Sequence, residues 1–119
     1  IIGPIQGTVD IFKELKESGR YKIYGLTNWS AETFPWAEEK FEFLQWFDGI
    51  VVSGIEKTRK PFPDFFQILF DRYQINPASA IFIDDSLRNI EGGKAVGLPG
   101  IHFSTPEQLR KDLQRLQVM

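Results

Sequence analysis

Two adjacent carboxylates, Asp84 and Asp85, follow directly on the apolar residues 81–83 in the stretch AIFIDDS. These apolar residues show no polar alternation, which is typical of a short strand buried on both faces. Adjacent carboxylates repel each other, and burial of either one without a partner costs free energy. We therefore expect a positive group close to them, either a basic side chain or a metal ion.

Further polar side chains stand at the end of another predicted strand and in a loop before a helix. Thr27 and Asn28 end the stretch YKIYGLTN, and Lys60 precedes the helical stretch PDFFQILFDRY. A hydroxyl, an amide, an ammonium and two carboxylates suit phosphoryl chemistry. Carboxylates can hold Mg²⁺, and Lys60 can neutralise an anionic nucleophile and a phosphate oxygen. Thr27 and backbone N–H groups can donate hydrogen bonds to the other phosphate oxygens.

The elements that must position these side chains alternate along the chain. Helical patterns take turns with short apolar runs typical of strands, and this order predicts a parallel α/β sheet. In such sheets ligands bind beyond the carboxyl ends of the strands, so polar residues at those ends converge when their strands lie close together. Helices are expected over residues 8–19, 31–47, 63–73, 86–97 and 104–116, and strands over residues 21–28, 49–54, 80–84 and 100–103.

Local signals mark several of the predicted helix ends. Gly19 is expected to end the first helix, and Ser86 is expected to cap the helix that follows the two carboxylates. In the last helix Thr105 is expected to be the cap, Pro106 the first helical residue, and Gln108 the partner that completes a capping box.

The composition limits the classes of function. The 119 residues suffice for one domain with a core, and 42% hydrophobic and 25% charged residues are typical of a globular protein. A net charge of −2 gives no electrostatic footprint for nucleic acid, and no apolar run approaches the roughly 20 residues of a membrane span. The absence of cysteine excludes disulfides and thiol catalysis. We expect a cytoplasmic protein that binds neither nucleic acid nor membranes.

Three stretches of the chain together carry a family resemblance. GLTN, RKPFPDFF and IFIDDSLRNIEGGKAVG resemble, in this order, the second, third and fourth motifs of the haloacid dehalogenase-like (HAD) hydrolases. The resemblance covers nearly the whole chain and is closest to the phosphatase-like subgroup, which carries the acidic pair. It implies a three-layer, Rossmann-like parallel sheet with helices on both faces, and hydrolysis through an aspartyl-phosphate intermediate with Mg²⁺ as cofactor.

The resemblance also implies roles for individual residues at the phosphate. Thr27 would bind a phosphate oxygen, and Asn28 beside it would position the substrate or the nucleophile. Lys60 would stabilise the aspartyl-phosphate intermediate. Thr27 and Lys60 are thus the expected catalytic residues of this chain, and all three would contact the phosphate.

A metal site is implied by the same resemblance. Asp85 would be the direct magnesium ligand, and Asp84 would act behind it or through water. Asn89 stands where many members of the family carry another acidic residue, so its contact with the metal would be weaker.

The sequence departs from the family at its first motif. It contains no D-x-D, and Asp10 lies in a helical pattern and cannot replace the nucleophile. We therefore expect residues 1–119 to be the C-terminal part of a HAD-like core domain with motifs two to four, without the nucleophile strand and the cap domain. The missing strand would lie between those ending at Thr27 and Asp85. We expect a missing N-terminal segment or a second chain to complete the sheet; the alternatives are that residues 1–5 take this place or that the sheet closes up differently. The chain alone would not hydrolyse phosphate esters.

The leading functional hypothesis is a magnesium-dependent hydrolase of a small phosphate monoester, of the sugar phosphate or nucleotide class. One alternative is a hydrolase of the 2-haloacid dehalogenase type, against which the acidic pair counts. Another is a non-catalytic remnant that binds a partner or a regulatory phosphate. A magnesium requirement separates the first two hypotheses, and the sequence upstream of residue 1 separates both from the third.

Several of these residues also have structural interpretations. The acidic pair can cap a helix, Thr27 and Asn28 can form an ordinary turn, and Lys60 can be a solvated member of a basic run. His102 is expected to be a half-buried structural residue rather than a catalytic base. Trp29 either lines a substrate pocket or packs beneath a loop, and an aromatic-rich stretch follows over residues 36–47.

Overall fold

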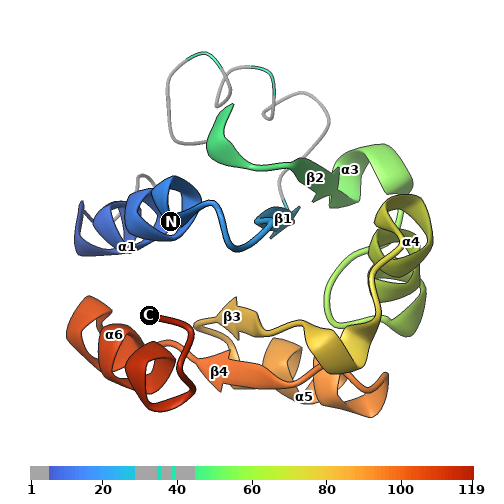
Figure 1. The fold of residues 1–119 in the computed structure, drawn as a ribbon. Helices are drawn as coiled ribbons and strands as arrows, with labels where there is room; N and C mark the ends of the chain where they lie inside the picture. Colours follow the sequence, from blue (N-terminus) through green and yellow to red (C-terminus); the bar gives the residue numbers. More distant parts are fainter. Residues whose placement is uncertain (1–5, 29–34, 36–38, 40–44) are drawn as a thin grey trace.

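Two parallel pairs of strands form the centre of the molecule. The structure, a computed structural model, describes residues 6–28, 35, 39 and 45–119. Strand β1 (Tyr24–Thr27) pairs with β2 (Gly49–Val52), and β3 (Phe82–Asp84) pairs with β4 (Gly100–His102). Among the described residues no strand joins the two pairs, and β1 and β3 are the strands that face each other (Figure 1).

Helices cover the strands on two sides. In Figure 1, α1 and α6 lie on one side of the strands, and α4 and α5 lie on the other. This arrangement confirms the predicted three-layer α/β architecture with a parallel, incomplete sheet. The helices are α1 (Gln6–Ser18), α3 (Ser53–Glu56), α4 (Pro63–Tyr73), α5 (Leu87–Ala95) and α6 (Pro106–Arg115), with a short 3₁₀ helix at Pro77–Ser79.

Each helical layer has its own hydrophobic core. The core on the side of α4 and α5 includes residues from β2 and β3, so it connects the two strand pairs. The core on the other side packs α1 and α6 against β4. The first consists of Val51, Phe65, Phe66, Leu69, Phe70, Phe82, Ile90 and Leu98, and the second of Ile11, Leu15, Ile101, Leu109 and Leu113.

A groove of about 630 Å³ runs between β1 and β3. Its walls are mainly apolar and come from both strands and from α1, α4 and α6. Among the lining side chains are Phe12, Leu26, Tyr73, Ile83 and Leu113. The edges of β1 and β3 with which no described strand pairs therefore border the same space.

The helix ends follow the local signals in the sequence. Gly19 ends α1 with a φ of +70°, and the Ser86 hydroxyl accepts the N–H of Asn89 at 3.4 Å. The Thr105 hydroxyl accepts the N–H of Gln108 at 3.1 Å, as predicted. The side chain of Gln108 reaches back, but it accepts the N–H of Ser104 at 2.9 Å rather than that of the cap residue.

Two expectations about burial were wrong. The strand at residues 81–83 is not buried on both faces, because Ile81 is 39% exposed while Phe82 is 8% exposed. Ile81 and Ile83 line the groove, where no described strand covers them. His102, expected to be half-buried, is exposed, and its Nε2 lies 2.9 Å from the backbone oxygen of Asp85.

Part of the aromatic-rich region lies outside the described residues. Of the predicted helix over residues 31–47, the structure describes only 35, 39 and 45–47. The predictions for Trp29, and for residues 36–38 and 40–44, therefore fall outside it. Phe47 is described, and its ring packs edge-on against Phe12 with the centroids 5.8 Å apart.

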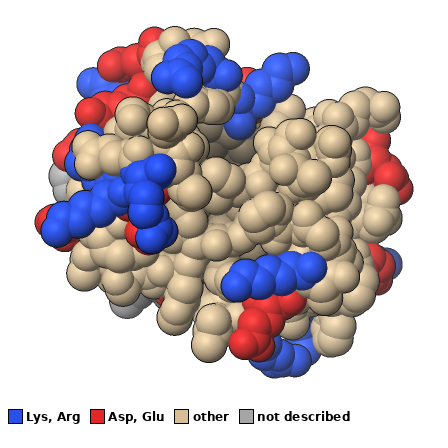
Figure 2. Space-filling view, turned by 60° about the horizontal axis from the view of Figure 1, so that its bottom comes forward, with Lys and Arg blue, Asp and Glu red and all other residues tan. Residues whose placement is uncertain are grey.

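The surface carries charges of both signs. On the face shown in Figure 2, lysine and arginine side chains lie among acidic ones, mostly toward the margins, around an uncharged and partly hollowed middle. The expectation that the protein does not bind nucleic acid stays a prediction. No helix in the described part of the chain is long and apolar enough to cross a membrane.

Candidate active site

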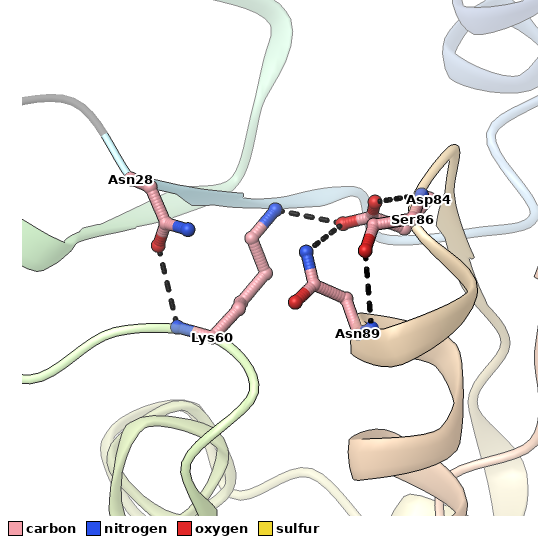
Figure 3. A network of polar contacts seen from close by, with 5 residues as sticks. All are labelled: Asn28, Lys60, Asp84, Ser86 and Asn89. Carbon is pink, nitrogen blue, oxygen red and sulfur yellow. Dashed lines mark hydrogen bonds and ion pairs between the residues drawn. The ribbon is translucent and has the colours of Figure 1, made fainter.

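An ion pair joins two of the residues singled out in the sequence. Lys60 Nζ lies 2.8 Å from Asp84 Oδ2, and the two side chains are only 13% and 6% exposed (Figure 3). Asp84 is the last residue of β3, and Lys60 lies in the loop before α4. The positive group expected beside the two carboxylates is therefore Lys60.

Two more donors hold the Asp84 carboxylate. The N–H of Ser86 donates to Oδ1 at 2.8 Å, and the Asn89 amide donates to Oδ2 at 3.3 Å (Figure 3). Burial opposes the charge on this carboxylate, but the hydrogen bond and charge of Lys60, with these two donors, hold the pKa of Asp84 below its usual range. The carboxylate is therefore fixed in position in its ionised form.

Asn28 connects the end of β1 to the same loop. Its side-chain oxygen accepts the backbone N–H of Lys60 at 3.3 Å (Figure 3). Thr27, the last residue of β1, stands directly before it and is opposite Val52 in the parallel register. The predicted convergence of the strand ends is therefore present for Asn28, Lys60, Asp84 and Asn89.

Asp85 is placed differently from its neighbour. Its side chain is exposed and makes no hydrogen bond or ion pair with the described residues, whereas Asp84 is held by Lys60. Asp84 is the last residue of β3, whereas Asp85 lies in the bend that follows the strand. The second carboxylate is therefore free to bind a ligand from solution.

The donor set fits Mg²⁺ rather than a metal held in a protein cage. Within the described residues no group of three or more His, Cys, Asp or Glu side chains could hold a metal ion. Mg²⁺ usually binds through one or two carboxylates and keeps several waters or phosphate oxygens, so it does not need such a group. The exposed carboxylate of Asp85 is compatible with such a site, and the Asp84 carboxylate beside it in the sequence is held by Lys60.

Gly92, which the sequence analysis did not single out, allows α5 to pack closely against the loop that carries Lys60. A Cβ at Gly92 in α5 would lie 2.5 Å from Pro61 Cβ and 2.7 Å from Pro61 O, so only glycine allows α5 to approach the loop that carries Lys60. The signal was present in the sequence, because Gly92 and Gly93 stand in the middle of a predicted helix, where glycine is unfavourable.

Comparison with known proteins places this site in a family. A model of the haloacid dehalogenase-like hydrolases matches residues 2–97. The sesquiterpene phosphatase astK of Aspergillus oryzae is 32% identical over 106 residues, which are 89% of this chain and 54% of that protein. The chain therefore belongs to the haloacid dehalogenase-like hydrolases, and it spans about half the length of this relative.

Solved structures show the same fold. A hydrolase from Streptococcus pneumoniae superposes with a TM-score of 0.79 at 26% identity over 92% of this chain and 57% of that one. The HAD-hydrolase YfnB of Bacillus subtilis, in a structure bound to magnesium, superposes with a TM-score of 0.73 at 26% identity over 87% of this chain and 48% of that one.

Proposed function

We propose that this chain forms the part of a magnesium-dependent HAD phosphatase that carries the second, third and fourth motifs. The substrate is a small phosphate monoester of the sugar phosphate or nucleotide class, cleaved through an aspartyl-phosphate intermediate. The observation that carries the proposal is the Lys60–Asp84 pair, which Asn28 and Asn89 hold at the strand ends. Similarity to a sesquiterpene phosphatase favours phosphate ester over halide chemistry.

The residues of this chain would act on the phosphate by charge and hydrogen bonding. The ammonium of Lys60 would neutralise the charge of the phosphate oxygens and of an attacking carboxylate. Asp84 orients this ammonium, since the two groups lie 2.8 Å apart. Thr27 and Asn28, at the end of β1, would donate hydrogen bonds to the other phosphate oxygens.

Asp85 would be the direct ligand of the magnesium ion, with Asp84 and Asn89 beside or behind it. Bound there, Mg²⁺ would neutralise charge on the phosphate during transfer. Similarity to a HAD-hydrolase whose structure contains magnesium supports this assignment.

The groove between β1 and β3 suggests where the attacking carboxylate comes from. A strand inserted there would pair with the edges of β1 and β3 that no described strand occupies, and would cover Ile81 and Ile83 with apolar side chains. Its carboxyl end would then lie near Asn28 and Asp84. We expect this strand to come from a further segment of the same polypeptide or from a second chain, and to carry the D-x-D that residues 1–119 lack.

Phosphate binding and turnover test the proposal together. With Mg²⁺ present, we expect Lys60→Ala to weaken binding of inorganic phosphate at least tenfold, whereas Lys94→Ala, at an exposed position of α5, should leave it unchanged. Calorimetry or NMR titration measures both. Equal binding by the two variants would contradict the phosphate site.

Turnover of p-nitrophenyl phosphate tests the strand. The 119-residue chain alone should show none, and addition of a D-x-D-bearing segment should produce magnesium-dependent turnover. Turnover by the chain alone that is lost in Asp85→Ala would show that no further strand is needed. Turnover of a 2-haloacid without magnesium would instead support the dehalogenase alternative.

A further inference from the structure

A polar pocket, separate from the groove between β1 and β3, lies beyond the carboxyl end of β2, beside the loop that carries Lys60. It has a volume of about 370 Å³ and opens widely to solvent. It is lined by Ser53, Gly54, Lys57, Thr58, Arg59 and Phe62. These residues flank Lys60 in the sequence, and Ser53 follows the strand residue that pairs with Thr27. The pocket is therefore a neighbour of the candidate active site and shares its loop.

The backbone at Lys57 is unusual for a side chain of this kind. Lys57 ends α3 in the left-handed conformation, with φ 60° and ψ 29°, and its N–H donates to Ser53 O at 2.8 Å. Glycine adopts this conformation without strain and is the usual residue at such a helix end. A lysine here costs conformational free energy, and strain of this kind is concentrated at functional sites.

The two cations of the pocket have no acidic partner among the described residues. Neither Lys57 nor Arg59 forms an ion pair, and Glu56, their nearest acidic neighbour in the sequence, is paired with Arg72 on α4. Arg59 lies over the ring of Phe62, with its guanidinium carbon 5.5 Å from the centroid. The aromatic ring thus supports the guanidinium while leaving its hydrogen-bond donors available.

One acidic residue lies at the margin of the pocket. The carboxylate of Asp64 accepts the hydroxyl of Thr58 at 2.7 Å. This leaves a net positive charge from Lys57 and Arg59 over a surface of small residues and one aromatic ring. A planar guanidinium beside an ammonium is well suited to a phosphate dianion, which both can contact at once.

We propose that this pocket binds a second phosphate group of the substrate, so that the preferred substrates are bisphosphates. The inference rests on the proposed function, because it takes the phosphate that is cleaved to lie at Lys60. Lys57 and Arg59 are then specificity residues: they contribute to affinity only when the substrate carries the second phosphate.

A matched pair of ligands tests this inference. Hexyl phosphate carries one phosphate, and hexane-1,6-diol bisphosphate carries a second on a flexible chain, which makes the comparison tolerant of the span between the sites. With Mg²⁺ present, the unaltered chain should prefer the bisphosphate. Lys57→Gly and Arg59→Ala should each lower that preference roughly three- to tenfold and leave hexyl phosphate binding unchanged.

Two variants keep the test interpretable. Lys57→Gly relieves backbone strain, so lost binding cannot be ascribed to misfolding, and Gln74→Gly makes the same change at another left-handed helix end, with φ 57°, away from the pocket. No preference for the bisphosphate in the unaltered chain, or a preference unchanged in Lys57→Gly, overturns the inference. Hexyl phosphate binding unchanged in Lys60→Ala would instead show that the proposed function itself is wrong.

Discussion

At the residue scale, the candidate site depends on one nearly buried ion pair. Lys60 and Asp84 lie 2.8 Å apart with 13% and 6% of their side chains exposed. Such pairs contribute little net stability, since the loss of hydration offsets most of the attraction, but removal of one partner leaves an unpaired charge. This pair is therefore better explained by the position it gives to the ammonium than by the stability of the fold.

A double-mutant cycle makes this explanation testable. Lys60→Met and Asp84→Asn should each lower the free energy of unfolding by about 1–3 kcal/mol, because each leaves a charged partner without its counterion. The double variant should lose clearly less than the sum of the two. Urea unfolding of the four proteins gives the coupling. Strictly additive losses would show that the pair is not coupled and would argue against the close contact.

At the scale of elements, Asp48 joins α1 to the segment that enters β1. Its carboxylate accepts the N–H of Ile23 at 2.7 Å and lies 3.0 Å from Lys16 Nζ, and its own N–H donates to Ile23 O at 2.6 Å. The hydrogen bond from Ile23, opposed by partial burial and assisted by Lys16, holds the pKa of Asp48 below its ordinary value of 3.8.

This lowered pKa predicts a pH-dependent stability. The stabilisation by Asp48 is complete above its ordinary pKa of 3.8 and is lost as the pH falls through the lowered value of the folded state. Asp48→Asn should therefore cost about 1 kcal/mol near pH 7, and the difference from the unaltered chain should disappear in strong acid. Lys16→Met, which keeps the Ile23 hydrogen bond, should cost less. Thermal unfolding from about pH 2 to about pH 7 measures the loss of stability in both variants. A difference that persists at the lowest pH would contradict this account.

Helix ends were predictable because they depend on neighbouring residues. The caps at Ser86 and Thr105 use hydrogen bonds to residues a few positions later, which the sequence places next to them. Burial of the strand at residues 81–83 was not predictable, because it depends on what lies in the groove beside it. The apolar run predicted that both faces of this strand are buried, but the described chain leaves Ile81 39% exposed.

The site was predictable to a similar extent. Parallel strands bring their carboxyl ends to one edge, which was enough to place Lys60 and Asn28 near Asp84. The link from Asn28 to the backbone of Lys60 depends on how two distant loops cross, and no local pattern encodes it. One feature could have been inferred locally: the helix–loop contact at Gly92, from the glycine pair.

At the scale of the whole molecule, the two strand pairs are held together from their faces rather than through their edges. One face is bridged by the core of α4 and α5, and the other by α1 packing on α6. This arrangement keeps the two edges apart at the width of the groove. The expectation that a further strand belongs between those ending at Thr27 and Asp85 stays a prediction.

The packing of α1 on α6 also has a consequence for the order of folding. Glu14 of α1 pairs with Arg110 of α6 across 96 residues of sequence, and Leu15 and Leu113 belong to the same core. Bringing such distant segments together costs loop-closure entropy before their contacts are made. The core on the side of α4 and α5, whose contacts are closer in sequence, can thus form first. The packing of α1 on α6 then follows as a late step of folding.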